Sequence, residues 1–82
     1  MNLNIKLFAT LKSKAQTNIL SIEIKDDRIS VKDLLEEISR QRPELESSLK
    51  SVLVAINGEY AFPEQEISAS DEIALFPPVS GG

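Results

Sequence analysis

Three residue types with chemical importance are missing from the 82-residue sequence: cysteine, histidine and tryptophan. Without cysteine the chain forms no disulfide and offers no thiolate, and without histidine it lacks the usual zinc ligand and proton shuttle. The acidic residues do not replace them, because their spacing does not fit a calcium loop. We therefore expect no metal site and no bound cofactor. We interpret the following acidic residues as solvated turn charges: Asp26, Asp27, Glu64, Glu66, Asp71 and Glu72.

Basic charge and long apolar runs are also scarce. Nine Lys and Arg are outnumbered by thirteen Asp and Glu, which gives a net charge of −4. A surface of this sign does not follow a phosphate backbone, so we expect no nucleic-acid partner. No stretch approaches the roughly 20 apolar residues of a membrane span, and residues 1–6 lack a basic region followed by an apolar run. We expect a cytoplasmic protein with no membrane partner.

The remaining composition is that of one small folded domain, with 41% hydrophobic and 27% charged residues. Apolar and polar residues alternate over residues 2–8 and 20–24, which predicts two strands with one apolar face each. These strands most readily pair antiparallel. The segment between them, residues 9–18, is ambiguous: a helical turn around Leu11 fits it but carries no weight in the prediction.

The clearest helix signal begins after Ser30. Val31, Leu34, Leu35 and Ile38 fall on one face of a helix, and Ser30 is a good N-cap residue. Pro43 marks the end, because the residue before a proline is pushed out of the helical region. Glu36 and Arg40 are at helical pairing distance on the polar side, and Leu45 and Leu49 indicate a further short helical turn.

The second half of the chain reads as three more strands. Residues 52–56 form an unbroken apolar run that suits a strand covered on both faces, and Asn57-Gly58 is a tight-turn signal. Residues 59–62 predict a short returning strand and residues 72–76 a last strand, which Pro77 and Pro78 terminate. The sequence thus predicts an α+β fold in which a mixed sheet packs on one main helix.

We expect the last six residues, Pro77-Pro78-Val79-Ser80-Gly81-Gly82, to form an extended tail after a folded domain of residues 1–76. Both prolines have a fixed φ and no N–H, so this segment leaves the sheet stiff and unpaired. Six residues reach at most about 20 Å, enough to thread the active site of another protein.

The two terminal glycines suit a chain whose own carboxylate reacts. A Cβ at either position would crowd a narrow tunnel, whereas glycine permits close approach and either sign of φ. The Gly82 carboxylate must first be activated, for instance as an acyl-adenylate. The acyl group then passes to a sulfur donor, giving a thiocarboxylate, or to a lysine amine, giving an isopeptide; the glycines alone do not say which. An inert, frayed terminus is the other interpretation.

Three segments resemble one known family. "LFAT" (7–10), "VLVAINGEY" (52–60) and above all "DEIALFPPVSGG" (71–82) are similar to the small, sulfur-carrying subunits of molybdopterin synthase, and the order of elements resembles their ubiquitin-like β-grasp fold. The similarity extends over essentially the whole chain. Ala69-Ser70 departs from it, since family members often have a glycine in that turn.

The resemblance implies a sulfur carrier rather than a catalyst in its own right. An E1-like adenylyltransferase would use ATP to adenylate Gly82, which would become a thiocarboxylate (1-thioglycine). The tail, Pro77 to Gly82, would then enter the large synthase subunit in a heterotetramer and donate sulfur to cyclic pyranopterin monophosphate. The catalytic groups would belong to the large subunit. A related carrier of the thiamin type and a ubiquitin-like protein modifier remain alternatives.

The fold that the resemblance implies also suggests a partner-binding patch. In β-grasp sheets the first and last strands are neighbours, so Phe8, Ala74 and Phe76 would share one exposed face, with Leu53 or Ala55 beside them. Exposed apolar clusters of this kind mark partner sites. The alternative is that loops or residues 9–18 cover Phe8 and make it part of the core.

Overall fold

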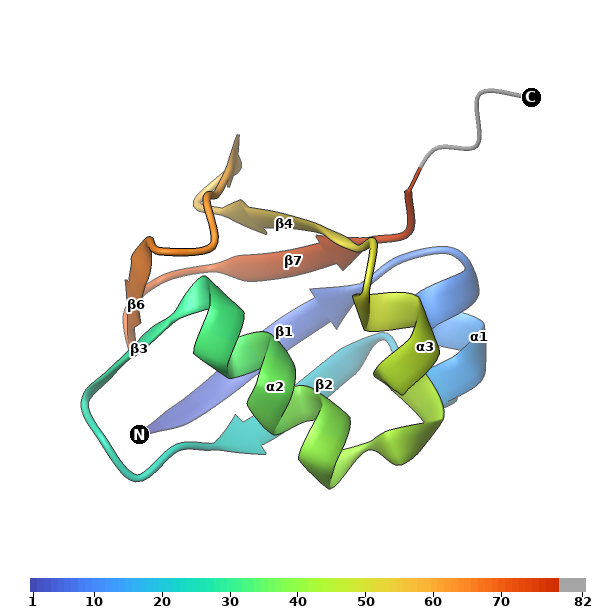
Figure 1. Cartoon of the computed structure of the whole chain (residues 1–82), viewed down its shortest axis with the longest axis horizontal. Helices are drawn as coiled ribbons and strands as arrows, with labels where there is room; N and C mark the ends of the chain where they lie inside the picture. Colours follow the sequence, from blue (N-terminus) through green and yellow to red (C-terminus); the bar gives the residue numbers. More distant parts are fainter. Residues whose placement is uncertain (79–82) are drawn as a thin grey trace.

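The computed structural model describes residues 1–78 (Figure 1). These residues form one sheet of five strands, a second sheet of two short strands, and helices packed on one side. In chain order the elements are β1 (Asn2–Leu7), α1 (Thr10–Ala15), β2 (Ile19–Glu23), β3 (Arg28–Ser30), α2 (Val31–Gln41), the 3-10 helix η1 (Pro43–Leu45), α3 (Glu46–Leu49), β4 (Leu53–Ile56), β5 (Glu59–Tyr60), β6 (Glu66–Ser68) and β7 (Ile73–Phe76).

The main sheet has the strand order β2-β1-β7-β4-β5. The last strand, β7, therefore lies in the middle of the sheet, parallel to β1 on one side and antiparallel to β4 on the other. The remaining neighbours pair antiparallel, including β1 with β2. The predicted α+β class, the mixed sheet and the antiparallel first pair are confirmed.

One face of this sheet carries the hydrophobic core. Because side chains alternate along a strand, every second residue points toward α2, which crosses that face (Figure 1). The burial pattern of β1 alternates strictly between exposed and buried, and that of β7 between half-buried and buried. The core is built from the following buried residues: Leu3, Ile5, Leu7, Leu11, Ala15, Leu20, Ile22, Ile24, Val31, Leu34, Ile38, Leu45, Leu49, Val54, Ile56, Ile67, Ile73 and Leu75.

Helix α2 begins and ends where the sequence predicts. The Ser30 hydroxyl oxygen accepts a hydrogen bond from the Asp33 N–H at 3.1 Å, which satisfies one of the free donors of the first turn. At the other end the Arg42 N–H donates to the Ile38 carbonyl at 2.7 Å, directly before Pro43. Leu45 and Leu49 are buried in the η1 and α3 turns that follow.

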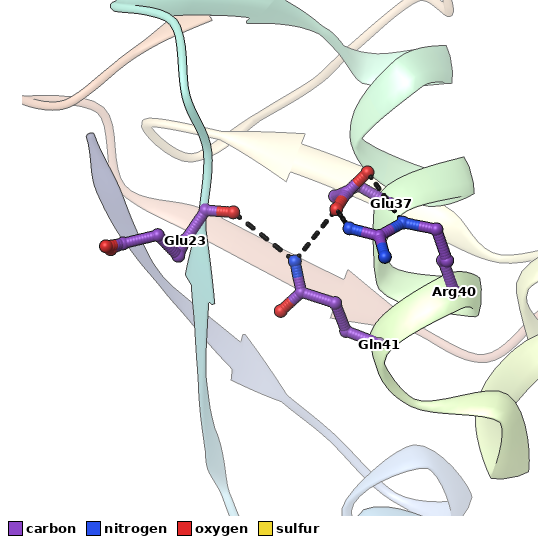
Figure 2. Close-up of polar contacts among 4 residues, drawn as sticks. All are labelled: Glu23, Glu37, Arg40 and Gln41. Carbon is purple, nitrogen blue, oxygen red and sulfur yellow. Dashed lines mark hydrogen bonds and ion pairs between the residues drawn. The ribbon is translucent and has the colours of Figure 1, made fainter.

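The polar face of α2 is joined to β2 by Gln41, and Arg40 pairs with Glu37 rather than with the predicted partner Glu36. Figure 2 shows that Arg40 pairs with Glu37, three residues earlier on the helix. The Gln41 amide donates to the Glu37 carboxylate at 2.9 Å and to the Glu23 carbonyl at 3.3 Å. The Arg40 and Gln41 hydrogen bonds lower the pKa of Glu37. The spacings of three and four residues are both compatible with pairing on a helix, so spacing alone could not choose between the two glutamates.

Three elements differ from the prediction. Residues 9–18 contain helix α1, which Leu11, fully buried, anchors to the core. The small sheet of β3 and β6 was missed, because strands of three residues are too short to show a period. Strand β5 ends at Tyr60 rather than at residue 62. In the described residues, no helix has the length and apolarity needed to cross a bilayer.

Candidate functional site

The outer face of the sheet, opposite α2, brings Phe8 and Phe76 together. The parallel register pairs Leu7 with Leu75, so the next residue of β1's chain lies beside Phe76. The two rings are stacked, with centroids 4.6 Å apart and planes 10° from parallel. Stacked pairs of this geometry contribute about 0.5–1.5 kcal/mol beyond their burial. Phe8 nevertheless stays 41% exposed, so the alternative that it belongs to the core is wrong.

Strand β4 extends this cluster sideways. Leu53 pairs with Phe76 and Ala55 with Ala74, so all four point to the outer face. We call the residues Phe8, Leu53, Ala55, Ala74 and Phe76 the outer apolar surface. Leu53 is 37% exposed, which corrects the expectation that this strand is covered on both faces. An exposed apolar cluster on a small acidic domain is typical of a docking site.

A shallow pocket of about 370 Å³ lies on this surface. Its walls include the two stacked rings and also three residues that were not predicted to belong to a docking surface: Lys6, Tyr60 and Glu72, the last of which was interpreted as a turn charge. Tyr60 is 73% exposed. The alternation that placed Phe8 outward also places Lys6 on the same face, so the signal for Lys6 was present in the sequence. Tyr60 and Glu72 could be placed at this pocket only from the strand order of the sheet, which the periodicity of the sequence does not reveal.

The turn after Phe8 contains a strained residue. Ala9 has φ 53° and ψ −128°, a conformation that glycine adopts far more readily than alanine. The Leu11 N–H donates to the Phe8 carbonyl at 3.2 Å and closes the turn. Because Leu11 is buried, the turn is held in place and fixes where β1 ends. Strain of this kind persists only where surrounding contacts impose it.

Asp71 braces the start of β7. Its carboxylate accepts hydrogen bonds from the Ser68 N–H and from the Asn57 side-chain amide, both at 2.9 Å. Asn57 also accepts from the Glu72 N–H at 2.9 Å through its side-chain oxygen. The Ser68 N–H, followed by the Asn57 amide, holds the pKa of Asp71 below its ordinary value. The Asp-Glu pair before the last strand thus joins the Asn57-Gly58 turn to β7.

The tail begins at the edge of the outer apolar surface. Strand β7 ends at Phe76, and Pro77 and Pro78 follow it outside any strand, with Pro77 half-buried and Pro78 exposed. The predicted tail residues Val79, Ser80, Gly81 and Gly82 lie outside the described residues, so their roles stay predictions. Within residues 1–78, no three Asp or Glu side chains come close enough together to hold a metal ion.

Comparisons with known proteins agree in one family. Residues 5–82 match the ThiS family. The molybdopterin synthase sulfur carrier subunit of Dictyostelium discoideum is 35% identical, over 95% of this chain and 93% of that one. Small archaeal modifier protein 1 of Haloferax volcanii is 36% identical over 94% of this chain and 97% of that one. The crystal structure of that protein superposes with a TM-score of 0.84 at 34% identity, covering both chains completely.

A further solved structure is described as a complex of subunits 1 and 2 of the molybdopterin-converting factor of Helicobacter pylori. It matches with a TM-score of 0.67 at 24% identity, over the full length of both chains, and shares the fold. Together with the strand order of the main sheet, these neighbours confirm the ubiquitin-like β-grasp fold.

Proposed function

The chain belongs to the ThiS family, and from this premise we propose that it is the sulfur carrier of a molybdopterin synthase. Two observations support the proposal. Relatives named as molybdopterin synthase sulfur carrier subunits are similar over nearly the full length. The structural observation on which the proposal depends is the position of Pro77 and Pro78. They directly follow Phe76, which ends β7 and belongs to the outer apolar surface. A partner that docks on this surface receives the tail at a fixed point.

In the proposed reaction the Gly82 carboxylate is the reacting group. A carboxylate oxygen attacks the α-phosphate of ATP in an E1-like adenylyltransferase, forming the acyl-adenylate and releasing pyrophosphate. A donor of sulfur at the oxidation level of sulfide then attacks the carbonyl carbon; the bond to AMP breaks, and Gly82 becomes a thiocarboxylate. This mechanism requires no acid or base from the carrier, which fits a chain without His or Cys.

The large synthase subunit is the proposed recipient. Docking on the outer apolar surface would direct residues 77–82 toward its active site, which lies within the roughly 20 Å that six residues can span. There the thiocarboxylate sulfur would attack a carbon of cyclic pyranopterin monophosphate and displace an oxygen substituent from it. Water would then cleave the resulting thioester at its acyl C–S bond, which leaves the sulfur on the pterin and returns Gly82 to the carboxylate. Two carriers acting in turn would supply both dithiolene sulfurs. Glycines at positions 81 and 82 leave room for the enzyme groups around the carbonyl.

A second function is favoured by one specific observation. The similarity to small archaeal modifier protein 1 is as high as the similarity to the carriers. The same activated Gly82 would then react with a lysine amine of another protein and form an isopeptide. The two functions share the first step and differ in the nucleophile.

The test is the intact mass of the chain purified from its own cells, with and without the large subunit. A sulfur carrier shows a species in which one oxygen is exchanged for sulfur, and co-purifies with the large subunit. A modifier instead appears attached to other proteins. One alanine added after Gly82 should remove both activities while leaving the fold unchanged. A chain that shows neither the mass shift nor conjugates contradicts the proposal.

A further inference from the structure

We propose that Lys6 selects and orients the docking partner by pairing with a carboxylate on that partner's surface. The inference deepens the proposed function and depends on it, since it concerns docking of the large subunit on the outer apolar surface. The first observation concerns charge: within residues 1–78 each arginine pairs with a carboxylate of the chain, whereas no lysine does, so Lys6 is available to a partner, and its position sets it apart from the other lysines.

The position of Lys6 is unusual for a basic residue of this chain. Within the five strands of the main sheet, all of them described, Lys6 is the only Lys or Arg. The sheet register places it between Ile19 of β2 and Ala74 of β7, on the outer face. It lines the pocket together with Phe8 and Phe76. A single cation therefore lies in a docking area whose other lining residues are mostly apolar, with Glu72 as the one anionic residue among them.

The position of Lys6 matters because docking of a partner would desolvate its ammonium group. A partner that covers the stacked rings also removes water from the Lys6 ammonium, because both belong to the same pocket. A buried ammonium without a counter-charge is strongly unfavourable, and removal of one partner of a buried pair is far more harmful than loss of an exposed one. A partner that fits this pocket must therefore bring an acceptor, and a carboxylate is the strongest.

Glu72 is the one acidic residue that lines the pocket, and it is the internal rival for this pairing. Its backbone N–H is tied to Asn57, and its carboxylate lies beyond ion-pair distance of Lys6. If Glu72 neutralised Lys6 during docking, removing its charge would weaken binding. If the partner supplies the carboxylate, removing the Glu72 charge leaves binding equal or stronger, because one repulsive group is gone.

The negative net charge of the chain makes Lys6 more important for the orientation of a docking partner. At −4 the whole molecule repels an acidic partner surface. Lys6 is a local attraction within this repulsive field, so it favours the one orientation that brings the partner carboxylate onto the pocket. Charge placement of this kind acts chiefly on association rate and specificity.

The experiment measures binding of the full chain to the large subunit encoded by the same genome, at low and high salt. Lys6→Glu should raise Kd by about 30-fold or more at low salt, mostly through slower association, and high salt should reduce this difference because it screens the new repulsion. Lys6→Met, which keeps the apolar stem, should raise it by about 5-fold. Lys25→Glu is the matched control: it makes the same change of net charge in the loop after β2, at the far end of the sheet, and should change Kd less than about 2-fold.

One further variant of this chain and a series of variants of the partner complete the experiment. Glu72→Gln should leave Kd unchanged or lower it. Single Asp or Glu to Lys changes across the partner's docking face should include one that restores binding of Lys6→Glu. Lys6→Glu that binds like Lys25→Glu overturns the inference, and so does a Glu72→Gln variant that binds as weakly as Lys6→Met. If Phe76→Asp weakens binding and Lys6→Glu does not, only the role of Lys6 fails; if the wild-type chain does not bind the large subunit, the proposed function fails with it.

Discussion

The two faces of the main sheet are made by the same strands and have opposite roles. On the inner face, leucine and isoleucine side chains are almost completely buried against α2. On the outer face, the alternate residues of the same strands are a mixture of polar and apolar side chains, and most of them remain at least partly exposed. Both faces are apolar around Phe76, yet the helix covers only one of them. The inner face accounts for folding, and the outer face, which no helix of residues 1–78 covers, is the surface on which we propose that a partner docks.

The largest expected effect is on the inner face. Leu75→Ala removes a fully buried side chain from the central strand and should lower the free energy of unfolding by about 2–5 kcal/mol. Leu53→Ala makes the same change on the outer face, where the side chain is already partly exposed, and should cost less than about 1 kcal/mol. Urea unfolding of both variants measures the difference. Equal losses of unfolding free energy in the two variants would contradict the conclusion that the inner face, and not the outer face, accounts for folding.

The reverse experiment targets the outer face. Phe76→Asp should reduce the affinity for the large subunit by about 2 kcal/mol or more, because it puts a charge at the centre of the outer apolar surface. Phe62→Asp is the matched control, since Phe62 is 74% exposed and does not line the pocket. Calorimetric titration gives both affinities, and circular dichroism checks folding. A folded Phe76→Asp variant with wild-type affinity would show that docking uses another face.

A smaller effect is expected at Asp71, whose carboxylate accepts two hydrogen bonds just before β7. Asp71→Asn weakens two hydrogen bonds and should lower the free energy of unfolding by about 1 kcal/mol at neutral pH. Since folding lowers the pKa of Asp71, its contribution is complete above the ordinary pKa of an aspartate and is lost as pH falls through the folded value.

Thermal unfolding between about pH 6 and pH 2 tests this sign. Wild type should lose stability below about pH 4 more steeply than Asp71→Asn. Asp27→Asn, in the loop before β3, controls for the loss of one carboxylate. Parallel pH curves for wild type and Asp71→Asn would contradict the assignment.

The smallest effect concerns the turn that ends β1 on the outer face. Ala9→Gly removes the strain of a positive φ and should change stability by about 0 to +1 kcal/mol. Ala69→Gly, at an exposed turn residue without a positive φ, should instead destabilise by up to about 1 kcal/mol. If Ala9→Gly raises the free energy of unfolding in urea and Ala69→Gly lowers it, Ala9 is strained in the wild type. If both substitutions lower it equally, the strain at Ala9 is contradicted.

Much of the fold could be predicted because it follows local patterns. Alternation gave β1 and β7, the Ser30 cap and Pro43 bounded α2, and Asn57-Gly58 gave the turn before β5. The pairing of β3 with β6 could not be found in this way, because Ile29 and Ile67 meet only through the tertiary fold. Helix α1 was equally hidden: its single strong signal, Leu11, gains its meaning from burial in the core.

The candidate site could be predicted only in part. The meeting of Phe8 and Phe76 followed from a resemblance to a known fold, because a parallel pairing of the first and last strands has no local signature. Lys6 was visible in the alternation of β1, but its significance required knowing that Ile19 and Ala74 flank it. The hydrogen bonds of Asp71 depend on Asn57, fourteen residues away, and no spacing rule joins them.

The central place of β7 also orders events in time. A sheet whose middle strand is the last to leave the ribosome stays open until that strand has been inserted between β1 and β4. Neither half of the aromatic stack can meet its partner earlier, so a nascent or partly unfolded carrier has no intact face to present. The loading step that we propose for Gly82 would therefore be confined by topology to molecules whose sheet is complete.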